Sequence, residues 1–166
     1  MIKDSFLLDG DIEVGIELAA NNGMLDISIA INNNSTDSVT FHNSFFMTNN
    51  FFYFRYANGE QGVPASGGNI RSVQWDFRVH HGTIVTIEPG MSWQFETQER
   101  YEREGNHVTM RRDMAHIVYD LSREISITIL NRYHRDSAER VREFVLDGVL
   151  LPAFRRTFVI NSILRY

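Results

Sequence analysis

Apolar and polar residues alternate along most of the chain, which is the pattern of β-strands that bury one face and expose the other. Isoleucine, valine and leucine alternate with glutamate and glycine over residues 12–18, and residues 25–31 repeat this period of two. Between these segments, Asn21, Asn22 and Gly23 tolerate a positive φ. The two segments are therefore predicted to form a β-hairpin.

The same period recurs in later segments, and polar turns separate them. Further strands are predicted over residues 39–41, 51–56, 70–79, 83–87, 92–97, 115–121, 125–130 and 157–164. The intervening turns and loops are residues 32–38, 57–69, 88–90 and 98–107. About nine short strands, with a turn roughly every 8 to 12 residues, are typical of an antiparallel β-sandwich.

One segment departs from this period and predicts a short helix near residues 137–147. Asp136 precedes it, and Glu139 stands three residues later, as in the capping box that begins many helices. Apolar residues then fall at helical spacing, and Gly148 stands where a helix C-terminus is often capped. A strand over residues 144–151 is the alternative.

The length of the chain fits one domain, and no repeat or linker divides residues 1–166. The absence of cysteine excludes disulfides and thiol catalysis. No apolar run approaches the roughly 18 residues that a membrane span needs, so no membrane partner is expected. The N-terminal residues lack the apolar stretch and cleavage site of a secretory signal. We therefore expect a single-domain, cytoplasmic protein.

The charges are unevenly distributed around a net charge of -5. Residues 1–99 carry 4 basic and 12 acidic side chains and residues 100–166 carry 12 and 9, which gives charges of -8 and +3. This distribution would orient a charged partner, or it reflects different solvation of the two ends. The acidic total argues against binding nucleic acid. The pairs Arg111–Arg112 and Arg155–Arg156 could contact phosphates, but isolated arginine pairs are usually surface salt-bridge partners.

Three stretches resemble a known class of domain: NGMLDISIAINNNSTDSVTFH, VTIEPGMSWQFET and ISITILNRY. Their strands, polar turn and I-x-P-G turn are similar to those of bacterial immunoglobulin-like β-sandwich domains, over residues 11–133. Such domains inhibit proteinases, accompany peptidases or serve as adhesion and accessory modules. The resemblance implies an immunoglobulin-like β-sandwich that binds other molecules and carries no catalytic residue. Trp75 would be its core aromatic residue, and the cysteine pair of antibody domains is absent.

Motifs of enzymatic chemistry are missing from the sequence. It contains no G-x-S-x-G elbow, no P-loop, no G-x-G-x-x-G and no H-E-x-x-H. Asp9, Asp11 and Glu13 would point the same way from an extended chain, but Ca²⁺ needs more ligands than these. A solvated strand edge is the simpler interpretation of this triplet. No cofactor is expected.

The sharpest enzymatic alternative is a cupin-like, metal-dependent enzyme. Its ligands would be His80, His81, Glu88 and His107. However, adjacent residues of a strand face opposite sides, so His80 and His81 cannot both bind one ion unless the strand bulges or turns. Exposed histidines in turns are the simpler interpretation.

A second alternative is a carbohydrate-binding accessory module, in which Trp75 and Trp93 would offer flat faces to sugar rings. Trp75 shares one side of its predicted strand with Phe77 and Val79, which favours a place in the core. Trp93 fits a core position and a surface position about equally well.

The densest aromatic stretch, FFMTNNFFYFRY at residues 45–56, is the main clue to function. If residues 51–56 form a strand, Phe51, Tyr53 and Arg55 share one side, and the other side faces the core. Aromatic residues and arginine are enriched at binding hot spots. The predicted helix, a second copy of the chain or a foreign protein would cover this side.

We therefore expect a non-enzymatic protein-binding module, acting as an inhibitor or a toxin-neutralising immunity protein. Its partner is expected to be another protein or a second copy of the chain. The residues predicted to bind this partner are Phe45, Phe46, Phe51, Tyr53, Arg55 and Trp93.

Overall fold

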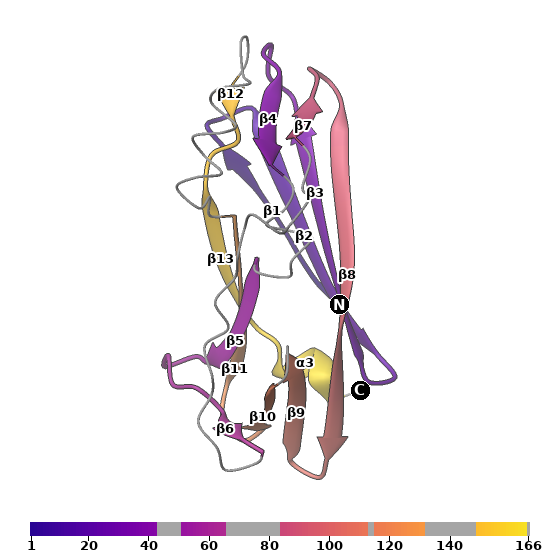
Figure 1. The fold of residues 1–166 in the computed structure, drawn as a ribbon, viewed down its shortest axis with the longest axis vertical. Helices are drawn as coiled ribbons and strands as arrows, with labels where there is room; N and C mark the ends of the chain where they lie inside the picture. Colours follow the sequence, from indigo (N-terminus) through magenta and orange to yellow (C-terminus); the bar gives the residue numbers. More distant parts are fainter. Residues whose placement is uncertain (43–50, 66–83, 113–114, 132–148, 166) are drawn as a thin grey trace.

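The computed structural model describes residues 1–42, 51–65, 84–112, 115–131 and 149–165, and this part of the chain is mostly β (Figure 1). The largest sheet has the order β1 (Ile2–Leu8), β2 (Ile12–Asn21), β3 (Met24–Asn33), β8 (Ser92–Glu104), β9 (His107–Arg112), β10 (Ala115–Asp120) and β6 (Val63–Pro64). A second sheet has the order β13 (Phe154–Val159), β11 (Ile125–Asn131) and β5 (Phe52–Tyr56). A third has the order β12 (Val149–Leu150), β4 (Val39–His42) and β7 (Ile84–Ile87). The described strands pair antiparallel except β12 with β4, so the predicted antiparallel β architecture is confirmed.

The predicted hairpin is present as β2 and β3. Asn22 (φ 49°) and Gly23 (φ 79°) form its turn, and Leu18 lies opposite Ile27. The inward-facing residues of the two strands are at most 4% exposed; they are Ile12, Val14, Ile16, Leu18, Leu25, Ile27, Ile29 and Ile31. The alternation in the sequence thus corresponds to one buried face of the sheet.

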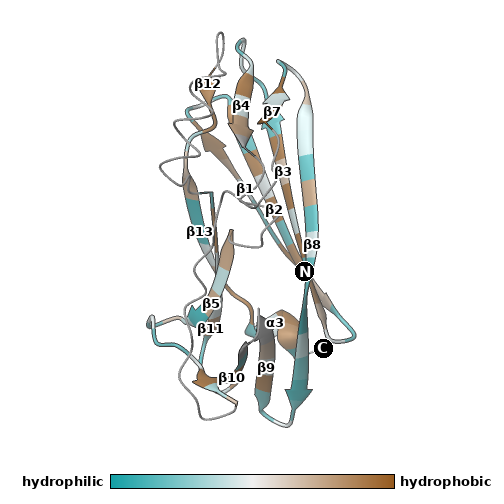
Figure 2. Ribbon diagram, in the orientation of Figure 1, coloured by the Kyte–Doolittle hydropathy of each residue, from teal (hydrophilic) through white to brown (hydrophobic). Residues whose placement is uncertain are grey.

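β8 is longer than predicted, because the polar segment at residues 98–107 is not a loop. β8 runs on to Glu104, and Gly105 (φ 59°) lies in the turn to β9. Tyr101 lies opposite Met110, and both side chains are buried. Figure 2 shows hydrophilic and hydrophobic bands alternating along β8. The charged residues on its solvent-facing side made this strand resemble a loop.

β8 belongs to two parts of the large sheet. Residues 92–100 pair with β3, and residues 101–104 pair with β9. In Figure 1, β3 accompanies the upper part of β8 and β9 accompanies its lower part. In the described sheet, β8 therefore joins the β1–β2–β3 part to the β9–β10–β6 part.

The two ends of the chain differ from the sequence prediction. β1 has no counterpart among the predicted strands, yet it pairs with β2 along its whole length. The predicted strand over residues 157–164 is wrong beyond Val159, where β13 ends and helix α3 (Asn161–Leu164) follows. Ile163 and Leu164 are both buried, and neighbouring residues of a strand cannot both face the core.

Aromatic side chains join the sheets across the core. Phe51, which precedes β5, contacts Phe95 of β8 with ring centroids 5.7 Å apart. Phe41 of β4 contacts Trp93 of β8 at 4.9 Å. Edge-to-face pairs of this kind add about 0.5–1.5 kcal/mol beyond the burial of their area. The two smaller sheets therefore pack on the inner face of the large sheet.

Some predictions concern residues outside the described part of the chain. These are the helix near residues 137–147 and the strand over residues 70–79. The prediction that residues 1–166 form one domain stays a prediction. In the ranges that the structure describes, no helix is long and apolar enough to cross a membrane.

Candidate binding surface

The outer face of the β13–β11–β5 sheet carries the candidate surface. On β5, Phe52, Phe54 and Tyr56 face the core and are at most 7% exposed, as their alternation predicted. Tyr53 and Arg55 point to the opposite side, where Tyr53 is half-buried and Arg55 is exposed. β13 contributes the exposed Arg155, Thr157 and Val159 to the same side. We call Tyr53, Arg55 and Arg155 the tyrosine–arginine surface.

Tyr53 lies between the two arginines of this surface. The guanidinium carbon of Arg55 is 4.7 Å from the centre of the Tyr53 ring, and that of Arg155 is 5.8 Å from it. Arg155 also donates a hydrogen bond from Nη2 to the phenol oxygen of Tyr53. Beneath the phenol, the hydroxyl oxygens of Thr128 and Thr157 are 2.9 Å apart. The register of the sheet produces this arrangement, because Tyr53 lies opposite Thr128 and Thr128 lies opposite Thr157.

The electrostatics of the surface act on the phenol. Partial burial on its own raises the pKa of Tyr53. The hydrogen bonds from Thr128 and Arg155, together with the positive charges of Arg155 and Arg55, lower this pKa, and their combined effect is larger. The pKa of Tyr53 therefore lies below its usual value of 10.0.

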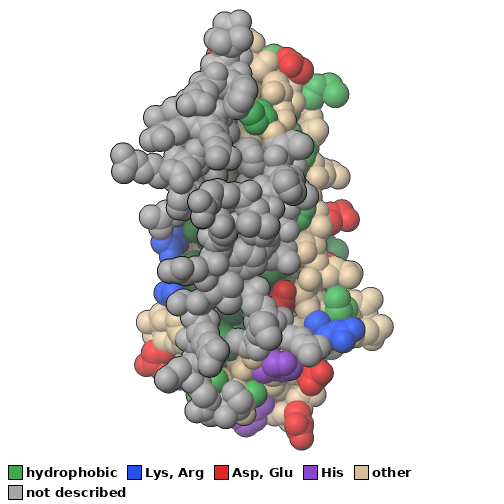
Figure 3. All heavy atoms as spheres, viewed as in Figure 1, with side chains coloured by type: hydrophobic (Ala, Val, Ile, Leu, Met, Phe, Trp, Pro, Cys, Tyr) green, Lys and Arg blue, Asp and Glu red, His purple; other side chains and the backbone are tan. Residues whose placement is uncertain are grey.

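The two arginines of the surface differ from their neighbours in how their charge is balanced. Arg123 pairs with Glu60 at 2.7 Å, and Arg156 lies 3.9 Å from Asp4. Arg55 and Arg155 form no ion pair with a carboxylate in the described ranges. Figure 3 shows Lys and Arg side chains on the side of the molecule where Figure 1 places β13 and β11. Two cations that no described carboxylate balances therefore flank Tyr53, on a protein with a net charge of -5.

Phe51 does not belong to this surface, although the sequence predicted it there. Its side chain is 0% exposed and packs against Phe52 and Phe95, with ring centroids 4.9 and 5.7 Å away. The strand begins only at Phe52, so the alternation does not extend back to Phe51. Phe45 and Phe46 lie outside the described residues.

Trp93 also lies away from the tyrosine–arginine surface. It is on the inner side of β8, opposite Ile31, and is half-buried. Its ring contacts Phe41 edge-on and stacks over Phe95 with centroids 6.0 Å apart. One face of the Trp93 ring is therefore stacked against Phe95 instead of being open to a sugar. Trp75, the other predicted sugar platform, is outside the described residues.

The two predicted metal ligands that the structure describes, Glu88 and His107, do not come together. Glu88 precedes β8 and His107 follows it, and a strand of 13 residues spans about 40 Å. Glu88 and His107 therefore cannot bind the same ion. His80 and His81 lie outside the described residues. Among the residues that the structure describes, no group of three or more His, Cys, Asp or Glu side chains is placed to hold a metal.

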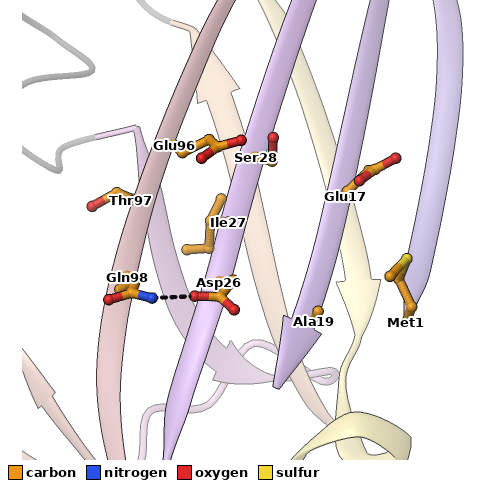
Figure 4. A pocket seen from close by; sticks show the side chains of 9 residues that line it. All are labelled: Met1, Glu17, Ala19, Asp26, Ile27, Ser28, Glu96, Thr97 and Gln98. Carbon is orange, nitrogen blue, oxygen red and sulfur yellow. Dashed lines mark hydrogen bonds between the residues drawn. The ribbon is translucent and has the colours of Figure 1, made fainter. Parts of the chain in front are cut away.

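A shallow groove of about 660 Å³ lies on the large sheet (Figure 4). Local sequence patterns do not predict it, because its lining comes from three strands and the N-terminal residue: Met1, Glu17, Ala19, Asp26, Ile27, Ser28, Glu96, Thr97 and Gln98. Gln98 donates a hydrogen bond to Asp26 at 2.6 Å, and Lys3 pairs with Glu17 at 3.2 Å. Neighbouring side chains thus already balance part of its acidity.

Arg155 belongs to the candidate surface, although local sequence patterns do not place it there. It was expected to be a surface salt-bridge partner, whereas its guanidinium is bound to a phenol. Only the pairing of β13 with β11, and of β11 with β5, reveals this contact. Comparisons of the chain with protein-family models, with curated proteins and with solved structures find no match.

Proposed function

We propose that this protein is a non-enzymatic binding module that recognises another protein through the tyrosine–arginine surface. The role that we propose is that of an inhibitor or a toxin-neutralising immunity protein with an immunoglobulin-like β-sandwich. The observation that carries this proposal is the position of the Tyr53 phenol between two arginines that no described carboxylate neutralises.

Three properties of the surface support binding. Tyrosine and arginine are among the residues that contribute most to protein interfaces. The ring and both guanidinium groups are already in contact, so a partner would not have to order them. The surface lies on strands of a sheet, which hold such groups more firmly than loops do.

The charge of the surface indicates the chemistry of the partner. A guanidinium group binds carboxylates through two parallel hydrogen bonds, and Arg55 is exposed and free of any described carboxylate. The partner is therefore expected to present aspartate or glutamate side chains to Arg55 and Arg155. Such contacts weaken as ionic strength rises, because salt screens exposed charges.

The test begins with affinity capture from a lysate of the source organism and continues with the captured protein in purified form. Its affinity is then measured by calorimetry for the wild type and for Arg55→Ala and Arg155→Ala. Each substitution is expected to weaken binding about 30-fold, the size of a 2 kcal/mol hot spot. Arg100→Ala is the matched control, because Arg100 is also exposed but lies on β8 in the large sheet.

Two results would overturn the proposal. The first is a purified partner that binds the wild type and both arginine variants equally well. The second is the failure of any captured protein to bind when purified. Circular dichroism of the variants, compared with that of the wild type, establishes that a loss of binding is not a loss of folding.

A further inference from the structure

β1 is an edge strand with one open side. It pairs with β2 over seven residues, from Ile2 opposite Leu18 to Leu8 opposite Ile12. Along its other side, β1 makes no backbone hydrogen bond with any described residue. A row of unpaired N–H and C=O groups of this length is a template for another strand.

The apolar side chains of β1 are also incompletely buried. Ile2, Phe6 and Leu8 face the core side and pack against it, yet they remain only half-buried. On the adjacent β2, the inward-facing residues are at most 4% exposed, because β2 has a neighbouring strand on each side. Leu7, on the outer side of β1, is 59% exposed. A strand added at this edge would bury part of all four side chains.

We propose that the strand added here is β1 of a second copy of the chain, running antiparallel, so that the two large sheets become one continuous sheet. A two-fold axis would pass through Ser5. The open-side N–H and C=O groups of both β1 strands would then hydrogen-bond to each other in one contact, as in closed two-fold dimers.

The register follows from the charges and faces of β1. Residues directly opposite each other share one face, so continuous sheets require odd residues to pair with odd and even with even. An axis at Lys3 would place two ammonium groups opposite each other, and one at Asp4 would place two carboxylates together. An axis at Ser5 avoids both and pairs all seven residues. It sets Ile2 against Leu8 of the second copy.

Charged residues on an edge strand often prevent such pairing, but those of β1 are engaged within the chain. Lys3 pairs with Glu17 at 3.2 Å on the outer side. Asp4 lies 3.9 Å from Arg156 of the facing sheet. In the Ser5 register, neither residue is opposite a charge of its own sign. The edge is therefore compatible with a second copy of itself.

The Ser5 register makes a geometric prediction that can be tested by cross-linking. Cα atoms of directly opposite residues are about 4.5–5.5 Å apart, within the range of about 4.4–6.8 Å that a disulfide needs. The chain has no cysteine, so a single Ser5→Cys substitution gives an unambiguous readout. Under mild oxidation, Ser5→Cys is expected to form a covalent dimer. Gln94→Cys, on the outer face of β8, is the matched control and is expected to stay monomeric.

A second pair of variants tests the register itself. Lys3 would lie opposite Leu7 of the second copy, and the two Lys3 residues would be about 13 Å apart. Lys3→Cys alone is therefore expected not to cross-link, whereas a mixture of Lys3→Cys and Leu7→Cys is expected to do so. Cross-linking of Lys3→Cys alone at the level of Ser5→Cys would overturn the register.

Light scattering of the unmodified protein tests the dimer without any substitution. The expected mass is twice 19.2 kDa, and Ser5→Lys, which sets two ammonium groups on the axis, is expected to reduce it to 19.2 kDa. Gln94→Lys is expected to leave the mass unchanged. A monomeric wild type at concentrations well above micromolar would overturn the proposal.

The tyrosine–arginine surface is on a different sheet, so its arginine variants are expected to remain dimers. Either proposal can therefore fail without the other.

Discussion

Tyr53 acquires its properties from residues that are distant in sequence. Arg155 is 102 positions away, yet it donates a hydrogen bond to the phenol because β5 and β13 both pair with β11. Arg55 adds a second positive charge beside the Tyr53 ring, since residues two apart in a strand share one side. An ordinary surface tyrosine thereby becomes a phenol in a positive environment.

Arg155→Ala is expected to raise the pKa of Tyr53, because it removes both a hydrogen bond to the phenol and a nearby positive charge. NMR titration of the tyrosine ring carbons, assigned with Tyr53→Phe, measures this pKa directly. Arg100→Ala is the control and is expected to leave the pKa of Tyr53 where it is in the wild type. An unchanged pKa in Arg155→Ala would contradict the contact between the two residues.

Because of the lowered pKa of Tyr53, the free energy of unfolding depends on pH in the alkaline range. A group whose pKa is lower in the folded state than in the unfolded state releases its proton first in the folded state. The stabilisation is therefore absent at neutral pH, grows as the pH rises through the folded-state pKa, and is complete above 10.0. In Tyr53→Phe, this increase in the free energy of unfolding at alkaline pH is expected to be absent.

At the scale of the element, β5 has one face in the core and one face that carries the candidate surface. Phe52, Phe54 and Tyr56 fill the core, while Tyr53 and Arg55 face outward. The phenol of Tyr56 also accepts a hydrogen bond from the N–H of Asp120 at 2.7 Å, which ties β5 to β10. Substitutions on the two faces should therefore have different consequences.

Phe51→Ala is expected to destabilise the protein by about 3–5 kcal/mol, because a fully buried aromatic ring leaves a cavity. Tyr53→Ala is the matched variant on the outer side, where the expected loss is about 1 kcal/mol. Urea denaturation followed by circular dichroism measures both changes. Equal losses for the two variants would show that Tyr53 is part of the core.

The strands with a clean period of two could be predicted from the sequence, and β2, β3 and β11 were. The end of β8 and the whole of β9 could not, because charged residues on their solvent-facing side conceal the buried Tyr101 and Met110. The candidate surface was predicted in part. Tyr53 and Arg55 are neighbours along the chain, whereas Arg155 joins them through a strand register that local patterns do not specify.

At the scale of the whole molecule, carboxylates and arginines gather at two different places in the described structure. Glu17, Asp26 and Glu96 line the groove on the large sheet, and Arg55 and Arg155 lie on the β13–β11–β5 sheet. A partner with exposed carboxylates would be repelled by the first surface and attracted by the second. The charge distribution is therefore suited to orient such a partner before contact.

The shared strand β8 has a consequence for the rates at which parts of the molecule open. Residues 93–99 of β8 pair with β3, so the deuterium exchange of those β8 amides that bond to β3 is expected to require unfolding of the β1–β2–β3–β8 part of the sheet. Amides near Gly105, at the tip of the β8–β9 turn, are expected to exchange much faster. Exchange followed by mass spectrometry measures both, and equal rates would contradict this expectation. In the described part of the large sheet, β9, β10 and β6 reach β3 only through β8. We therefore expect β9, β10 and β6, once their hydrogen bonds to β5 break, to open together while β1, β2 and β3 stay paired.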